Sequence, residues 1–195
     1  MTRYTLIGST TSPYVRRLRI AMNGLDFDFK MMMIFDPAQR AEFKKITPVL
    51  KIPVLQIHSS GQIQNIYDSR VIYNYLNKKH WQHDLSIEQE NILTIIDGVN
   101  DSLVTLYSMT LCGMKIEEDK RFIMAQRERV IEGFDVLNQL WTSESAWDYP
   151  SISLYCLIDW AVFRELIQID RWPHLLQFYK VMAKQPLLKE TDPRN

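Results

Sequence analysis

The spacing of hydrophobic residues predicts four β-strands in the first 77 residues. Apolar runs of strand length cover residues 4–8, 54–58 and 62–67, and Ser59-Ser60-Gly61 between the last two indicates a β-hairpin. Residues 27–33 alternate between apolar and polar positions, as in a half-exposed strand. We expect this strand to direct two methionines, Met31 and Met33, toward the core.

Helices separate these strands. Ser12 is suited to the N-cap of a helix over residues 13–23, because Pro13 fits the first helical position and Gly24 lies just past the end. A second helix is expected over 69–76, and the polar segment 36–45 predicts a short helix or a mobile loop. The late hairpin adds an antiparallel pair, so the order β-α-β-(α)-β-β-α is not a plain doubly wound sheet.

Beyond residue 77 the pattern predicts helices only. Residues 78–85 are polar and aperiodic, so we expect a linker between a domain over 1–77 and an all-helical domain over 86–195. Apolar residues then recur at helical spacing, residues 151–167 are apolar nearly all round, and a last helix covers 173–184. Asp159 lies within the predicted buried helix, where it either pairs across the bundle or faces an interdomain cleft. The residues at helical spacing in the first of these segments are Ile92, Ile95, Ile96, Val99, Leu103 and Leu106. Those in the second are Ile123, Arg127, Val130, Phe134, Leu137 and Trp141, of which only Arg127 is polar.

Composition removes several classes of function. Hydrophobic residues make up 46% of the 195 residues and charged residues 24%, as in ordinary globular proteins, and Lys+Arg and Asp+Glu balance at 23 each. This balance indicates neither a nucleic-acid nor a membrane partner. Cys112 and Cys156 lie far apart, and the four histidines form no metal-binding pattern, so we expect no metal and a reducing, cytoplasmic location. We also expect no signal peptide and no membrane span.

The strand-to-helix junction at Ser12-Pro13-Tyr14 is a candidate site for a thiolate. A helix N-terminus offers unpaired N–H groups and the positive end of the helix dipole, and a hydroxyl there can donate a hydrogen bond to an anion. Lowering a thiol pKa from ~8.5 by about two units takes roughly 2.7 kcal/mol of preferential stabilisation, which these groups can supply. Taken alone, Ser12 is more simply explained as a helix cap.

Two further features complete the pattern. Pro53 in Lys51-Ile52-Pro53 opens a strand without a backbone N–H, and a cis bond there would turn the polar backbone of Ile52 toward an extended peptide. Asp68-Ser69 begins a helix whose N-terminus suits a carboxylate, while Asp68 suits an ammonium group. An edge-strand proline and a helix cap are the simpler alternatives. They do not explain why two helix N-termini and an extended backbone edge occur in one small domain.

Together these motifs resemble the glutathione-binding site of glutathione transferases, and Gly8 to Arg17 is most similar to the bacterial YibF-like branch. The resemblance implies the glutathione transferase fold, an α/β thioredoxin-like domain followed by an all-α helical bundle. It further implies that Ser12, with Ser9 as the second candidate, stabilises the glutathione thiolate. Ile52 beside a cis Pro53 would pair with the cysteinyl backbone, and glutathione would be a co-substrate, with no metal. The remaining glutathione contacts would come from Tyr14, Lys51, Asp68 and Ser69, and a hydrophobic co-substrate would lie near Tyr14, Tyr107, Trp160 and Phe163.

The sequence departs from the family at two positions. Ser151-Ile152-Ser153-Leu154 lacks the acidic partner of the family's capping box, so only Ser151 is expected to cap the buried helix. Leu50 and Lys51 occupy a loop in which the family commonly has a glycine before the cis proline.

The resemblance favours an enzyme in which the glutathione thiolate attacks a small hydrophobic electrophile, and it implies a homodimer. A glutathione-dependent disulfide reductase or peroxidase is the first alternative, although a serine at position 12 cannot exchange with a disulfide. The second alternative is a non-catalytic protein of this fold that binds a partner in the stress response. The electrophile is the least readable part, because fold does not determine function.

Overall fold

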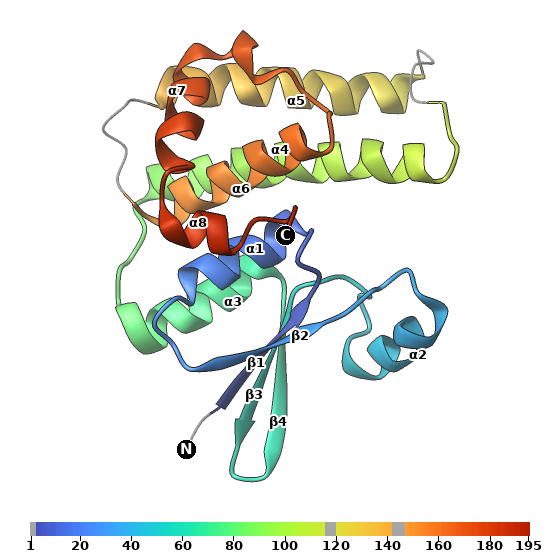
Figure 1. The fold of residues 1–195 in the computed structure, drawn as a ribbon, viewed down its shortest axis with the longest axis vertical. Helices are drawn as coiled ribbons and strands as arrows, with labels where there is room; N and C mark the ends of the chain where they lie inside the picture. Colours follow the sequence, from blue (N-terminus) through green and yellow to red (C-terminus); the bar gives the residue numbers. More distant parts are fainter. Residues whose placement is uncertain (1–2, 116–119, 142–146) are drawn as a thin grey trace. The chain divides into compact units, whose positions relative to one another are not determined.

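The computed structural model describes residues 3–115, 120–141 and 147–195. Residue contacts divide the chain into two compact units, Met1–Asp84 with Pro186–Asn195, and Leu85–Gln185. The first unit contains a mixed four-stranded sheet with helices and the second unit is helical, which is the architecture that the resemblance implies (Figure 1).

The sheet has the strand order β2-β1-β3-β4. β1 pairs with β2 in parallel and with β3 in antiparallel, and β3 and β4 form the predicted antiparallel hairpin. Ser60 and Gly61 both have positive φ in its turn, 50° and 77°, as the twist of a two-residue hairpin requires. The strands are β1 (Arg3–Gly8), β2 (Phe27–Met31), β3 (Val54–Ser59) and β4 (Gln62–Tyr67).

Three helices cover this sheet. α1 (Pro13–Ala21) and α3 (Ser69–Leu76) pack against each other on one side, and α2 (Pro37–Ile46) is separate from them (Figure 1). Phe43 is the buried residue of α2, and it packs in a cluster with Ile7 and Val54 of the sheet. The predicted Ser12 cap is present, and Asp36 caps α2, so the segment over 36–45 is a helix.

The prediction that Met31 and Met33 face the core is wrong. Met31 and Met33 are 43% and 50% exposed, whereas Met32 between them is 3% exposed and packs beside Phe43. β2 ends at Met31, and the Met32 N–H donates to the Gly8 carbonyl at 2.9 Å. The two-residue alternation therefore stops where the strand stops, and the next side chain turns inward.

The predicted linker is partly helical. A π-helical turn, η1 (Asn77–Trp81), continues α3, and its aromatic side chains attach it to the first unit. Trp81 stacks on Tyr73 with ring centroids 5.8 Å apart, and the Tyr4 hydroxyl lies 2.9 Å from His80 Nε2. The Tyr4–His80 contact joins residues far apart in the chain, so the polar composition of the segment did not reveal it.

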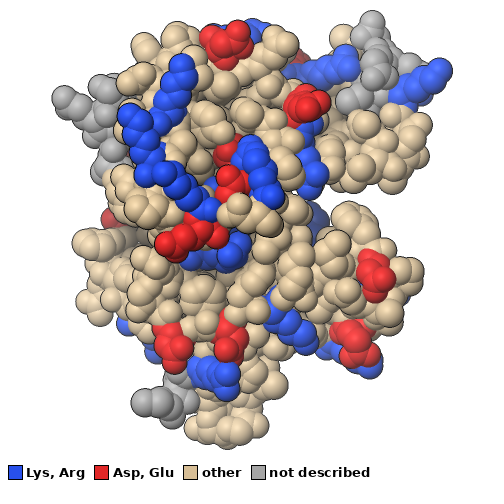
Figure 2. All heavy atoms as spheres, in the orientation of Figure 1, with Lys and Arg blue, Asp and Glu red and all other residues tan. Residues whose placement is uncertain are grey.

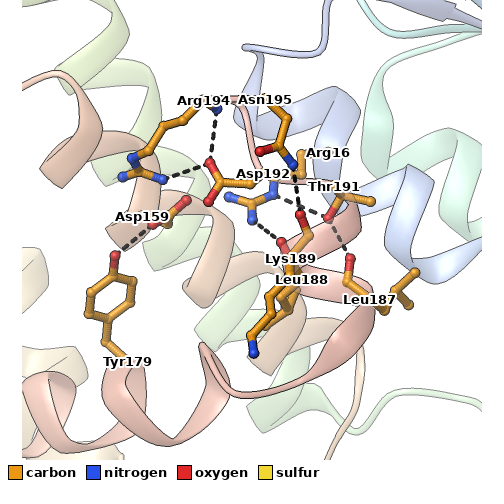
Figure 3. Close-up of polar contacts among 10 residues, drawn as sticks. All are labelled: Arg16, Asp159, Tyr179, Leu187, Leu188, Lys189, Thr191, Asp192, Arg194 and Asn195. Carbon is orange, nitrogen blue, oxygen red and sulfur yellow. Dashed lines mark hydrogen bonds and ion pairs between the residues drawn. The ribbon is translucent and has the colours of Figure 1, made fainter.

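The end of the chain also differs from the predicted domain limits. Pro186 begins a further helix, α8 (Pro186–Glu190), and residues Pro186–Asn195 cluster with the first unit. Arg16 of α1, 2% exposed, donates to the Leu188 carbonyl at 2.8 Å and to the Thr191 hydroxyl at 3.4 Å (Figure 3). The buried Arg16 guanidinium thus binds the C-terminal segment to α1 by hydrogen bonds.

The helical unit has a central buried helix. Every residue of α6 from Tyr149 to Ala161 is buried. Tyr179 of α7 donates a 2.6 Å hydrogen bond to Asp159, also shown in Figure 3, so Asp159 pairs within the bundle. The helices of this unit are α4 (Ile87–Leu111), α5 (Arg121–Leu140), α6 (Tyr149–Phe163), the 3₁₀ turn η2 (Ile169–Arg171) and α7 (Pro173–Met182).

The cap of α6 lies three residues earlier than predicted. Asp148 accepts from the Ser151 N–H at 2.9 Å, and the Ser151 hydroxyl contacts the Asp148 backbone in return. The acidic member of the capping box is therefore present at its first position, with the serine at its last.

On the face drawn in Figure 2, Lys and Arg side chains lie interspersed with Asp and Glu. The sequence has a formal net charge of +0. Among the described residues, no helix has both the length and the apolar character needed to cross a membrane.

Candidate functional site

Three chain segments with candidate chemistry meet at one end of the sheet. Ile7 of β1 pairs with Val54 of β3, and Val54 pairs with Tyr67 of β4. The segment after β1, the segment before β3 and the segment after β4 therefore start from neighbouring positions. These segments carry Ser9 and Ser12, Lys51, Ile52 and Pro53, and Asp68 and Ser69.

Ser12 is the better placed of the two candidate hydroxyls. Its Oγ accepts a long 3.4 Å hydrogen bond from the Val15 N–H, which uses an oxygen lone pair and leaves the hydroxyl proton to donate to a ligand. Ser9 Oγ instead accepts from the Thr11 N–H at 3.3 Å and lies 3.0 Å from the Thr11 hydroxyl. The Ser9 side chain thus stabilises the turn that leads to Ser12.

Gly8 determines how closely this turn approaches the sheet. A Cβ on Gly8 would lie 2.4 Å from Cγ2 and 2.9 Å from Cγ1 of Val15, whose side chain is fully buried. A β-branched side chain has few alternative rotamers, so it cannot move aside easily. The start of α1 therefore lies against β1 in a position that only glycine permits.

We expect Gly8→Ala to lower the free energy of unfolding by about 1–3 kcal/mol, because the added methyl overpacks this contact. Urea denaturation would measure the change. Gly98→Ala is the matched control, since a Cβ there meets only Arg129 Cδ at 3.7 Å and alanine favours a helix by about 0.5–1 kcal/mol. Equal effects of the two substitutions would contradict this view of Gly8.

The peptide bond between Ile52 and Pro53 is cis. The β1–β3 ladder begins at Val54, so the backbone of Ile52 lies outside it. Leu50 has φ of 53°, in the left-handed region that favours glycine, so leucine adopts a conformation for which glycine is the usual residue. Ile52 is half-buried and Lys51 is exposed.

Asp68 and Ser69 divide their roles differently from what we expected. Asp68, not Ser69, caps α3, with its Oδ1 accepting from the N–H groups of Arg70 at 2.8 Å and Val71 at 3.3 Å. Asp68 has φ of 69°, and non-glycine residues with positive φ cluster at functional sites. Ser69 is 1% exposed, and its hydroxyl accepts from the Arg17 guanidinium at 2.5 Å.

Comparisons with known proteins point to the family that the sequence motifs resemble. Residues 6–83 match the family model of the glutathione S-transferase N-terminal domain. The first unit contains a glutathione S-transferase N-terminal domain. The chain is 24% identical to an uncharacterized GST-like protein of Escherichia coli (strain K12), YibF, over 96% of this chain and 98% of that protein.

Solved glutathione transferase structures extend the likeness to the helical unit. A family member from Pseudomonas fluorescens Pf-5, with bound glutathione, has a TM-score of 0.82 at 26% identity and covers 97% of this chain and 98% of its own. A glutathione S-transferase from Methylobacillus flagellatus KT, with glutathione bound, has a TM-score of 0.80 at 26% identity, with 97% and 99% covered. The likeness therefore spans both units of the chain.

Positive charge gathers on α1 of this glutathione S-transferase domain. Arg16, Arg17 and Arg19 lie on the helix, which has no acidic residue in its first turn. Burial lowers the pKa of Arg19, and the neighbouring charge of Arg16 adds to the shift. The Arg17 guanidinium lies 5.3 Å from the centroid of the Tyr14 ring. The sequence analysis did not predict that Arg16 and Arg17 bind buried polar groups. Three arginines in a helix that must pack on a sheet could have indicated that some of them are buried and paired.

The residues expected near a second substrate lie in the helical unit, apart from Tyr14. Tyr107 of α4 contacts Trp160 of α6 edge to face, with centroids 5.6 Å apart, and Trp160 is buried. Phe163 is half-buried at the end of α6. Arg164, which the sequence did not single out, contacts the rings of both Phe163 and Tyr107. Among the described residues, no cluster of histidine, cysteine or acidic side chains is arranged to hold a metal ion.

Proposed function

We propose that this protein is a glutathione transferase that binds glutathione at the three strand ends and stabilises its thiolate with Ser12. The observation that carries the proposal is the alignment of Ile7, Val54 and Tyr67 across the sheet, which places two helix N-termini and the Ile52 backbone at one end. The glutathione reported in the Pseudomonas fluorescens and Methylobacillus flagellatus structures supports the same ligand.

Each part of glutathione has a chemically suited group in this arrangement. The Ser12 hydroxyl donates to the thiolate, and the backbone of Ile52 pairs with the cysteinyl residue. Asp68 has used only Oδ1 as a cap, so Oδ2 can accept from the α-ammonium of the γ-glutamyl residue. The α-carboxylate lies at the N-terminus of α3 beside Ser69, and Lys51 attracts the glycyl carboxylate.

The proposed reaction is a nucleophilic attack by the glutathione sulfur. The thiol loses its proton to solvent, its electron pair forms a carbon–sulfur bond with an apolar electrophile, and the leaving group departs with the bonding pair. Ser12 stays protonated throughout, because it stabilises the anion and is not the base. The arginines of α1 add to the positive potential that favours the anion.

Calorimetric titration with glutathione tests the binding step, and Asp68→Asn is the informative variant. Asparagine caps helices and tolerates positive φ, so the substitution removes the charge and keeps the local fold. We expect glutathione affinity to fall about 3- to 5-fold, the value of one solvent-accessible ion pair.

Asp148→Asn makes the same change at the cap of α6 and is expected to leave glutathione affinity unchanged. Absence of binding to the unaltered protein would overturn the proposed function and favour a partner-binding role for the fold.

A further inference from the structure

Arg17 of α1 is buried against the start of α3. It is 2% exposed, and the two helices pack on each other within the first unit. Its Nη2 donates to Ser69 Oγ at 2.5 Å, and Ser69, the first residue of α3, is itself 1% exposed. The structure therefore holds a positive charge behind the N-terminus of α3, shielded from solvent.

The cap of α3 would by itself repel an anion. A helix N-terminus is equivalent to about half a positive charge, whereas the Asp68 carboxylate that caps α3 carries a full negative charge. Asp68 Oδ1 also accepts from the N–H groups of Arg70 and Val71, two of the donors that an anion could otherwise use. A ligand carboxylate at this helix start therefore needs a further positive charge close by, and Arg17 supplies one.

Arg70 is a second cation at the start of α3, but it is placed differently. Arg70 is half-buried, so solvent and salt screen its charge more strongly than the charge of the buried Arg17. Arg17 also restricts the Ser69 side chain through their hydrogen bond, which keeps the first turn of α3 in one arrangement. The buried arginine is thus the stronger candidate for holding an anion here.

We propose that Arg17 is a positioning residue for the γ-glutamyl head group of glutathione. Its charge, acting through the start of α3 and Ser69, holds the α-carboxylate, while Asp68 holds the α-ammonium. This inference rests on the proposed glutathione transferase function and assigns the selectivity of that site for a free α-amino acid head group to two residues of opposite charge. Without the Arg17 charge, the ligand carboxylate faces the Asp68 carboxylate uncompensated.

Two analogues of glutathione test the inference, because each lacks one charge of the head group. Glutaryl-cysteinylglycine keeps the carboxylate and lacks the ammonium, whereas 4-aminobutyryl-cysteinylglycine keeps the ammonium and lacks the carboxylate. Calorimetric titration gives the affinity of glutathione and of both analogues for the unaltered protein and for Arg17→Met. Methionine preserves much of the packing of the apolar stem and removes the charge.

We expect Arg17→Met to weaken the binding of glutathione and of the glutaryl analogue about 5- to 20-fold, and not to weaken that of the 4-aminobutyryl analogue. Asp68→Asn is expected to show the opposite selectivity, with weaker binding of the 4-aminobutyryl analogue only. Arg17→Lys keeps a positive charge without the planar fork, so it should restore part of the affinity for the carboxylate. Loss of packing alone would not separate the two analogues in this way.

Arg3→Met is the control for the loss of one positive charge from the first unit. Arg3 begins β1, at the opposite end of the strand from Gly8, and its Nη2 lies 2.7 Å from Asp28 Oδ2. The affinities for all three ligands should stay within about 2-fold in this variant. Arg17→Gln decides the question if Arg17→Met does not fold, because glutamine can still donate to Ser69 but carries no charge.

The outcomes separate this inference from the proposed function. Equal losses of affinity for the three ligands in Arg17→Met would assign Arg17 to the packing of α1 on α3 and overturn the inference. Unchanged affinities in Arg17→Met, or in Arg17→Gln in its place, overturn it as well. A carboxylate-dependent loss in Arg70→Met, with none in the Arg17 variants, would transfer the role to Arg70. Absence of glutathione binding to the unaltered protein overturns the proposed function and this inference together.

Discussion

Ser12→Ala is expected to lower the transferase rate near pH 6.5 by about 10- to 100-fold. A hydrogen bond to a charged group contributes about 1.5–3 kcal/mol, which corresponds to a rise of one to two units in the pKa of bound glutathione. Below the thiol pKa the rate follows the thiolate fraction, so the loss is largest at low pH. As the pH rises through the raised pKa, the thiolate forms without the hydroxyl and the two proteins converge.

The measurement is the pH profile of kcat/KM, together with the ultraviolet absorbance of the thiolate in the binary complex. Ser12 also caps α1, and alanine costs about 1 kcal/mol at an N-cap, whereas glycine costs only a few tenths. Ser12→Gly is therefore the matched variant, since it removes the hydroxyl and keeps most of the cap.

Ser9→Ala removes the hydroxyl that is engaged with Thr11 and should leave the thiol pKa unchanged. An unchanged pH profile in Ser12→Gly, with a shifted one in Ser9→Ala, would transfer the role to Ser9.

Arg16→Met is expected to lower the free energy of unfolding by about 2–4 kcal/mol. Arg16 is 2% exposed and binds the Leu188 carbonyl and the Thr191 hydroxyl. Methionine preserves the packing of the apolar stem and leaves the buried carbonyl without this donor, and breaking a buried polar network of this kind is among the costlier substitutions.

Denaturant unfolding measures the loss, and limited proteolysis of residues 186–195 shows whether the terminal segment has detached. Arg19→Met is the control on the same helix, because Arg19 is only half-buried and its guanidinium contacts the half-buried Phe29 ring, 4.9 Å away. We expect it to cost less than about 1 kcal/mol. Equal losses of unfolding free energy in the two variants would show that the hydrogen bonds of Arg16 to the C-terminal segment do not stabilise the fold.

Local signals account for most of what could be predicted about the candidate site. Ser12 followed by Pro13 specified the start of α1, and Asp68-Ser69 placed the start of α3 correctly. The assignment of the cap to Asp68 required the structure, because Asp and Ser cap helices almost equally well. The cis bond at Pro53 followed from the resemblance, and a leucine at position 50 adopts the conformation for which glycine is the usual choice.

The errors share one cause. Met32 turns inward because β2 ends, and Asp148 caps α6 three residues before the predicted cap. Asn77–Trp81 is helical and is contacted by Tyr4 and Tyr73. In each case the outcome depends on a partner or on an element boundary that the hydrophobic period does not encode. Boundaries depend on which backbone groups find partners, and this is determined by the folded chain.

The sequence alone determined the order of strands and helices up to α3, the helix starts at Pro13 and Ser69, and the family likeness, because periodicity, caps and turns act between residues close in the chain. Only the tertiary structure decided that the ends of β1, β3 and β4 share one register row, that Pro186–Asn195 returns to Arg16, and that Arg164 stacks on Tyr107. These contacts join residues distant in sequence, and buried charge and packing select them only once the whole chain has folded.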